Sequence, residues 1–209
     1  MKTMLAYKKI LCVCTAVVAV VMFAQIAIAT TIDFEDLTLG TVYNVGDTFT
    51  SAGVQITGEQ FFQLPSGSTT GGFATVGNGA LAGGTGLELG SINNINFRFN
   101  FGAPLDALVL QYGEFGGNIN LEINGTLVNV LNFADVAPVV AGTSVFALDT
   151  GTPGQSTGSL FIIGNINSFA IGGQELAIDN IVASVPEPAT ITMLGFGVLL
   201  ALKRKKPLH

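Results

Sequence analysis

The chain has 209 residues, among them 27 glycines, two cysteines and no tryptophan, and its net charge is −6. Its single histidine, His209, is the last residue, which excludes a Ser-His-Asp triad, a Cys-His pair or a His-ligated zinc site from the body of the chain. Residues 30–185 contain 13 acidic residues and one basic residue, Arg98, and a net charge of −12 repels nucleic acid and anionic lipid headgroups.

The first 29 residues have the pattern of a signal peptide. Lysines precede an apolar run that ends in Ala27-Ile28-Ala29, the small-x-small pattern that signal peptidase requires. We expect cleavage after Ala29. The alternative is a retained transmembrane anchor, because the apolar run is long enough to be one. Both Cys12 and Cys14 lie in this segment, so the mature chain is expected to have neither a disulfide nor a thiol nucleophile.

Residues 30–184 are long enough for one domain with its own core. They contain no convincing amphipathic helix. Short apolar or alternating runs are separated by Gly, Asn, Asp and Pro, a pattern typical of an antiparallel sandwich or barrel. We expect an all-β domain with an antiparallel jelly-roll β-sandwich fold. Strands are expected at Thr31–Phe34, Val54–Thr57, Gln60–Leu64, Phe73–Val76, Asn96–Phe101, Ala107–Tyr112, Ile119–Ile123, Thr126–Val130, Ser144–Leu148, Ser159–Ile163, Ser168–Ile171 and Leu176–Val182.

Three stretches of this body carry more specific signals. Residues 96–101 alternate so that their three Phe share one face, and the aliphatic residues of 118–123 do the same. Asn124-Gly125 follows and predicts a hairpin, because both residues tolerate positive φ. The glycine-rich stretch 66–90 is expected to be a long connection with one strand. It lacks the Gly-Lys-Ser/Thr ending of a phosphate loop.

Residues 185–209 have three parts in a fixed order. Two prolines keep Val185-Pro186-Glu187-Pro188 extended. The uncharged segment Ala189–Leu202 follows, and as a short C-terminal helix it would span ~21 Å, less than the ~30 Å of a hydrocarbon core. A basic cluster then favours the cytoplasmic side of the membrane and places the acidic domain outside. The cluster consists of Lys203, Arg204, Lys205 and Lys206.

This order of Pro-Glu-Pro, short apolar segment and basic cluster resembles the PEP-CTERM sorting signal of Gram-negative bacteria, over about 25 of the 209 residues. The resemblance implies recognition by an exosortase, a membrane enzyme that removes the tail, and a link to exopolysaccharide or biofilm production. We therefore expect export, transient anchoring in the inner membrane, and a final place at the cell surface or in the extracellular matrix. The alternative is a plain tail anchor with a proline-rich hinge.

The end of the body, Glu175–Val182, reads ELAIDNIV. It resembles the last strand of jelly-roll, galactose-binding-like and carbohydrate-binding sandwiches, in many of which the first and last strands lie together and nearby acids ligate a structural Ca²⁺. Calcium takes about six to eight oxygen ligands. The resemblance makes Asp33, Glu35, Glu175 and Asp179 candidate calcium ligands. The alternative is that these acids flank strand ends and bind only water.

Sugar sites combine apolar, commonly aromatic, surfaces with a few polar groups. The loop 111–117, QYGEFGG, is the best candidate, with Tyr112, Glu114 and Phe115. The alternative is a strand end with core aromatics. We expect a non-catalytic surface or biofilm-matrix protein that associates with extracellular polysaccharide. A purely structural matrix protein without a ligand site is one alternative. A glycosidase is another, because it needs only two carboxylates about 5–10 Å apart.

Overall fold

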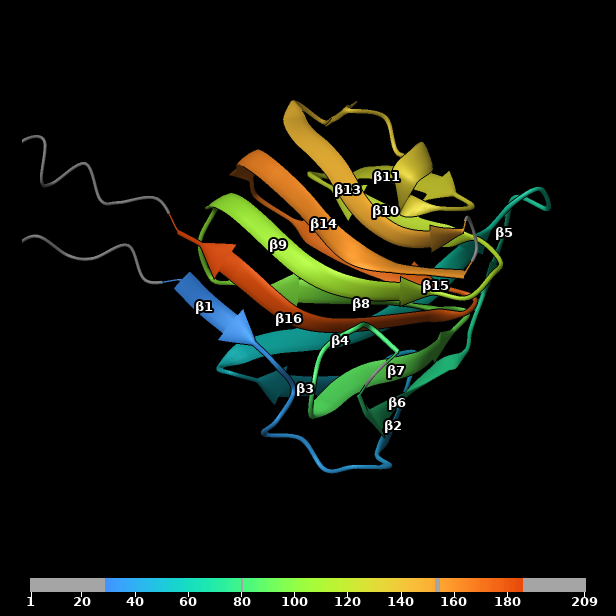
Figure 1. The fold of residues 1–209 in the computed structure, drawn as a ribbon, viewed down its shortest axis with the longest axis vertical. Coiled ribbons are helices and arrows are strands. Elements are labelled where there is room, and N and C mark those ends of the chain that lie inside the picture. The colour runs from blue at the N-terminus through green and yellow to red at the C-terminus, as the bar shows by residue number, and fades with distance from the viewer. Residues whose placement is uncertain (1–28, 80, 153–154, 186–209) are drawn as a thin grey trace, which may run out of the picture. The chain divides into compact units, whose positions relative to one another are not determined.

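The computed structural model describes residues 29–79, 81–152 and 155–185, which belong to one compact unit, Ile28–Val185 (Figure 1). The predicted signal segment with Ala27, the motif 186–188, the apolar run and the basic cluster 203–206 all lie outside these ranges. The helices found within these ranges include none with the length and apolar character needed to cross a membrane.

The first sheet has nine antiparallel strands, in the order β12-β13-β14-β9-β16-β7-β6-β2, with β1 paired to β16. Its strands are β1 (Ala29–Ile32), β2 (Val42–Asn44), β6 (Phe73–Asn78), β7 (Leu87–Asn93), β9 (Leu105–Glu114), β12 (Val139–Val140), β13 (Thr143–Thr152), β14 (Gln155–Ile166) and β16 (Leu176–Ser184).

The second sheet has seven antiparallel strands, in the order β11-β10-β15-β8-β4-β3, with β5 paired to β4. Its strands are β3 (Thr48–Ser51), β4 (Val54–Gln63), β5 (Ser68–Thr70), β8 (Ile95–Asn100), β10 (Ile119–Ile123), β11 (Thr126–Val130) and β15 (Phe169–Gly173). A short 3-10 helix, η1, spans Phe133–Asp135.

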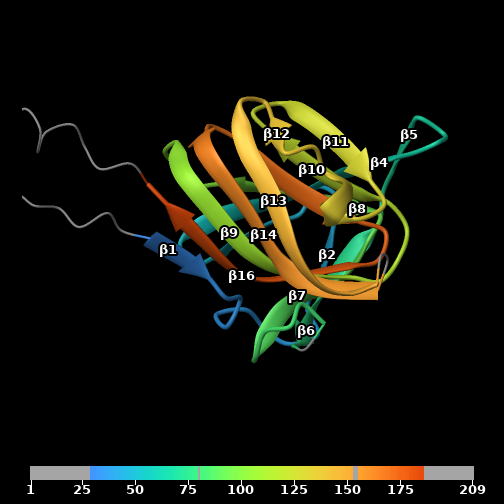
Figure 2. The same ribbon diagram turned by 45° about the horizontal axis from the view of Figure 1, so that its top comes forward.

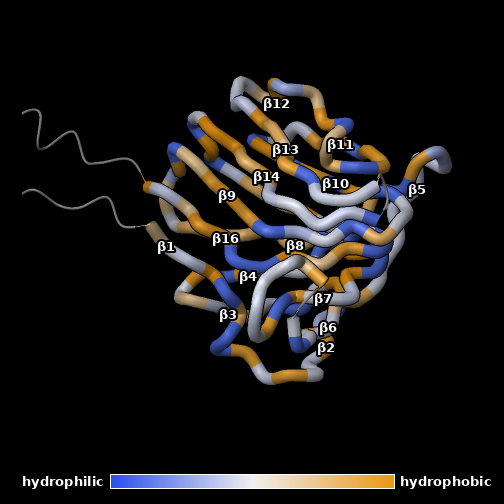
Figure 3. Tube along the Cα trace, in the orientation of Figure 1, coloured by the Kyte–Doolittle hydropathy of each residue, from blue (hydrophilic) through white to orange (hydrophobic). Residues whose placement is uncertain are grey.

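The two sheets form two layers, and their inner faces enclose the core (Figure 2). Hydrophobic and hydrophilic residues alternate along several strands (Figure 3). In β8, for example, Phe97 and Phe99 are buried, while Arg98 between them points away from the core. This is the period-two pattern of a sheet with one buried face. The predicted antiparallel sandwich is confirmed.

The first and last strands of the domain lie side by side, as the resemblance to jelly-roll domains implied. In the β1–β16 ladder Ala29 is opposite Ser184, and Ile32 is opposite Ile181. The strand β1 begins at the residue after which we expect signal cleavage, so the mature chain would start inside this ladder. Both ends of the domain therefore leave from the same region of the first sheet (Figure 1).

Every expected strand has a counterpart, with some differences in extent. The runs 54–57 and 60–64 form the single strand β4. The strand after Ala29 ends at Ile32, because Phe34 has φ 58°, outside the extended region. The Asn124-Gly125 hairpin is confirmed, with φ of 51° and 76° at its two turn residues.

The glycine-rich stretch 66–90 departs from expectation. It holds β5, β6 and the first residues of β7, so the prediction of one strand was wrong. At Gly72 a glycine is needed because the backbone of β7 passes close by: a Cβ at this position would overlap the carbonyl oxygen of Asn93. The strands β2 and β3 were also missed. They are short, and most of their residues are partly or fully exposed, which leaves little hydrophobic signal.

Candidate functional site

Three of the four predicted calcium ligands lie near one another beside loop 81–86. Asp179, on β16, is 1% exposed, and the charges of Asp33 and Glu35 act on it. The fourth carboxylate of this acidic cluster is Glu88, which is also 1% exposed. Sequence reasoning missed Glu88, because it lies in the part of the glycine-rich stretch that follows the expected strand Phe73–Val76 and was assigned to a connection. Asp33 and Glu35 belong to the segment that follows β1, so the β1–β16 pairing brings the cluster together.

Two of these carboxylates hold the loop by its backbone. The amide of Leu87 donates a hydrogen bond to Oε1 of Glu35 at 2.6 Å. The amides of Leu81 and Ala82 donate to the two carboxylate oxygens of Glu88 at 3.3 and 2.8 Å. Hydrogen bonds from backbone amides stabilise a carboxylate that is removed from water. Several carboxylate oxygens of the cluster therefore already accept hydrogen bonds from the protein backbone.

Glycines allow the loop to come this close. A Cβ at Gly84 would overlap Oδ2 of Asp179, and a Cβ at Gly86 would overlap Oε1 of Glu35. Gly86 also has φ +91°, a conformation that L side chains rarely adopt. The composition of this loop is therefore explained by its close contact with the carboxylates of Asp179 and Glu35.

Burial, together with the negative charges of Glu88, Asp33 and Glu35, raises the pKa of Asp179 to about 6, although the hydrogen bond from the backbone amide of Asn180 lowers it. Desolvation and like charges both favour the protonated acid. A cation bound here would relieve the repulsion. Within the ranges the structure describes, however, no group of three or more His, Cys, Asp or Glu has the arrangement of a metal site. Calcium binding by Asp33, Glu35 and Asp179 stays a prediction.

The fourth predicted ligand, Glu175, lies elsewhere. It precedes β16, in the turn after β15, and its carbonyl accepts a hydrogen bond from the amide of Phe115 at 2.9 Å. Its side chain lines a pocket that we call the Phe115 pocket, with a volume of about 570 Å³. Strand alternation would place Glu175 on the same face as Asp179, but β16 begins only at Leu176, so Glu175 does not join the acidic cluster.

The Phe115 pocket joins exposed apolar side chains to polar ones. Phe73 is 43% exposed, Leu81 44% and Phe115 36%. The polar residues that line it are Thr75, Ser91, Asn93, Gln174 and Glu175. The amide of Gln174 is fixed in place: its Oε1 accepts from the amide of Asn118 at 2.8 Å, and its Nε2 donates to Asn94 at 3.2 Å.

The other two predicted carbohydrate residues need correction. Tyr112 is fully buried, with its ring centroid 4.5 Å from that of Phe133. Glu114 is 1% exposed, and its carboxylate accepts from the amide of Phe133 at 3.0 Å and from the hydroxyl of Ser156 at 2.8 Å. Both side chains face the inside of the sandwich, so of the predicted three only Phe115 is available to a ligand.

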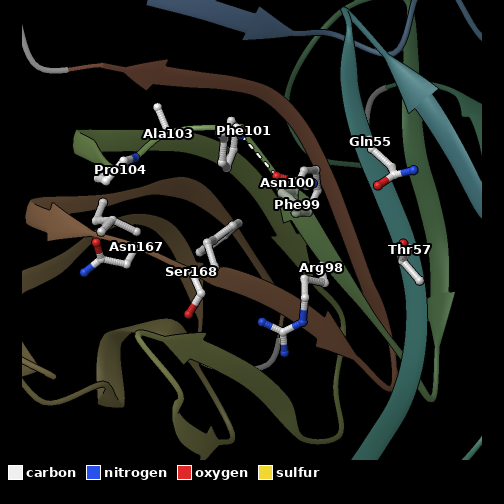
Figure 4. Close-up of a pocket in the computed structure, with 13 residues that line it drawn as sticks. Gln55, Thr57, Arg98, Phe99, Asn100, Phe101, Ala103, Pro104, Asn167 and Ser168 are labelled. Atoms are coloured by element: carbon white, nitrogen blue, oxygen red, sulfur yellow. Dashed lines mark hydrogen bonds between the residues drawn. The ribbon is translucent and has the colours of Figure 1, made fainter.

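A second pocket, of about 480 Å³, lies on the outer face of the second sheet; we call it the Arg98 groove (Figure 4). Arg98 donates from Nε to Glu59 at 2.6 Å, and from Nη2 to Glu59 at 3.0 Å and to Glu122 at 2.9 Å. The hydrogen bonds to Glu122 and Glu59 raise the pKa of the guanidinium. The sequence singled out Arg98 only as the sole base of the body. The alternation in residues 96–101 already placed it opposite the buried Phe residues.

Comparison with known proteins finds one match. The model of the PEP-CTERM protein-sorting motif matches residues 184–206, which confirms the sorting motif inferred from the sequence. This motif implies an exported protein that is anchored in the membrane through its C-terminal region until an exosortase processes it. No curated protein and no solved structure matches the chain.

Proposed function

We propose that this exosortase-sorted protein associates with extracellular polysaccharide, without catalysis, through the Phe115 pocket. The observation that carries the proposal is the placement of two exposed rings, Phe73 and Phe115, in one pocket with Asn93, Gln174 and Glu175. Aromatic rings offer rigid apolar surfaces for the apolar faces of sugars, and amides and carboxylates bond to their hydroxyl groups.

The electrostatics of the domain favour a neutral polymer. Residues 30–185 carry a net charge of −12, and among the residues that line the pocket Glu175 is charged and no base is present. An acidic polysaccharide would be repelled by both. We therefore expect neutral sugars to bind, with their hydroxyl groups facing the Glu175 carboxylate and the Asn93 amide.

Two features support binding rather than hydrolysis. A glycosidase of the usual kind needs two carboxylates across the scissile bond. Among the described residues that line the Phe115 pocket, Glu175 is the only one with a carboxylate. Glu35 and Glu88 are not among the residues that line the pocket, and their carboxylates accept hydrogen bonds from backbone amides.

Retention of the purified unit 28–185 on an affinity column of the host's exopolysaccharide tests the proposal. This unit contains its own hydrophobic core and does not include the sorting tail, residues 186–209. We expect replacement of Phe73 and Phe115 by Ala to weaken retention about tenfold, because two stacking surfaces are lost. The matched control is Phe146→Ala: Phe146 is 45% exposed but pairs with Phe161, away from the pocket.

Loss of retention in the double variant alone supports the proposed function. Equal loss in the Phe146 variant would mean general surface stickiness rather than a site. If the unmodified domain is not retained, polysaccharide association through this domain is wrong, and a purely structural matrix role is the better hypothesis.

A further inference from the structure

We propose that the Arg98 groove is a second binding site for a neutral, polyhydroxylated polymer, so that one protein domain binds two polysaccharide chains. The polymer class rests on the proposed function, whereas the site itself rests on the groove alone. The groove lies across three hydrogen-bonded strands, β4, β8 and β15, in which Arg98 is paired with Thr57 on one side and Ala170 on the other.

The floor of the groove is fixed by an ion pair that spans a strand. Ala170 is opposite Arg98 on β8 and opposite Glu122 on β10. The small side chain of Ala170 leaves room for the guanidinium to reach across β15 to Glu122, while Glu59 holds its other edge. A guanidinium bound on two sides has little freedom left to lose when a ligand binds.

Several polar groups around this floor have no internal partner. Among the hydrogen bonds of the described ranges, none uses Nη1 of Arg98, the side-chain amides of Gln55 and Asn167, or the hydroxyl of Ser168. Figure 4 shows Gln55 and Thr57 on one side of Arg98 and Asn167 and Ser168 on the other. Donors and acceptors on both sides of a shallow floor suit a chain that carries many hydroxyl groups.

The charges of the groove select against ions. One guanidinium lies between two carboxylates, so the three side chains together carry one negative charge. An anionic ligand would be repelled by Glu59 and Glu122, and a cation would compete with Arg98 for the same oxygens. A neutral ligand meets neither cost, and it can accept a hydrogen bond from the free edge of the guanidinium.

The two pockets lie on different sheets, and segments that line them flank opposite ends of β8 and β15. The Phe115 pocket includes Asn93, before β8, and Gln174, after β15. The Arg98 groove includes residues 101–104, after β8, and Asn167, before β15. A strand of this length separates its ends by roughly 17 Å. Two sites on opposite faces favour binding of two chains, and therefore crosslinking by one molecule.

Arg98 itself provides the reporter for the test, because it is the only arginine between residues 30 and 185. Its Nε–H group gives a single side-chain signal in a ¹⁵N–¹H spectrum of the unit 28–185. The probes are neutral oligosaccharides cut from a β-glucan, a mannan and a galactan. We expect one of them to shift this signal. Gln55→Ala with Asn167→Ala should raise the Kd measured there about fivefold, whereas Phe73→Ala with Phe115→Ala should leave it unchanged.

The outcomes separate the two proposals. A shift at the Phe115 amide with no shift at Arg98 overturns the second site and keeps the proposed function. A shift at Arg98 with none at Phe115 keeps the groove and overturns the Phe115 pocket. No shift at either position with all three probes overturns both. Crosslinking adds a further criterion: the unmodified domain should precipitate the binding polymer, and each double variant should bind it without precipitation.

Discussion

The backbone amide of Leu87 donates a hydrogen bond to the carboxylate of Glu35 at 2.6 Å, across 52 positions of the chain. This bond ties the start of β7 to the segment that follows β1. The loop 81–86 is held against the carboxylates of Glu35, Glu88 and Asp179 rather than left free in solvent. Its glycines are structural requirements, although the same composition is typical of a flexible connection.

Replacement of Gly86 tests this requirement. Gly86→Ala should destabilise the domain by about 2 kcal/mol more than the control Gly46→Ala. The two glycines have nearly the same φ, +91° and +92°, but a Cβ at Gly86 would overlap Glu35, whereas a Cβ at Gly46 meets nothing within 4 Å. Urea unfolding of the unit 28–185 measures the difference. Equal effects would show that only the backbone conformation matters, not the contact.

The raised pKa of Asp179 predicts a pH dependence of stability. The ordinary pKa is 3.8 and the folded value is about 6, so between these values the folded state binds more protons than the unfolded state. The free energy of unfolding should therefore fall as the pH rises from about 4 to about 6. Asp179→Asn should reduce this slope, since the side chain no longer titrates. A variant with the same slope as the unmodified domain would contradict the assignment to Asp179.

Calcium binding predicts a thermal shift that depends on particular acids. If Asp33, Glu35 and Asp179 hold Ca²⁺, calcium should raise the Tm and a chelator should reverse the change. Glu35→Gln should abolish the shift. Glu175→Gln should keep it, because Glu175 lines the Phe115 pocket and not the acidic cluster. An unmodified domain whose Tm does not respond to calcium would show that the acids bind no calcium.

The sorting motif makes a prediction for the cell. Pro186→Ala with Pro188→Ala should leave the unprocessed chain in the membrane fraction, because the two prolines belong to the matched sorting motif that implies exosortase processing. Immunoblotting of membrane and extracellular fractions measures this. The control is Pro138→Ala, in the loop before β12. Normal release of the double variant would mean that the two prolines are not needed for processing.

Alternation and turn chemistry made most of the fold predictable. The Phe residues of β8 and the Asn124-Gly125 turn follow local rules that the tertiary structure obeys. The same rule, used more strictly, would have placed Tyr112 and Glu114 inside, since they continue the buried series of Leu108 and Leu110 on β9.

Other features depend on contacts that local sequence does not encode. Glu88 belongs to the acidic cluster because β7 lies beside β16, and its neighbours in the sequence give no periodic signal. The Phe115 pocket joins residues from β6, β7, the start of β16 and three connecting segments. The Arg98 groove depends on the register that places Ala170 between Arg98 and Glu122.

The position of β16 also has a mechanical consequence. This strand is flanked by β9 on one side and by β7 and β1 on the other, and it leads directly into the sorting tail. While the tail is in the membrane, a pulling force on the domain enters the fold through an interior strand. Extraction of that strand would shear two ladders at once, whereas an edge strand would resist with one. The sorting tail therefore follows a strand that can leave the sheet only if hydrogen bonds on both of its sides are broken.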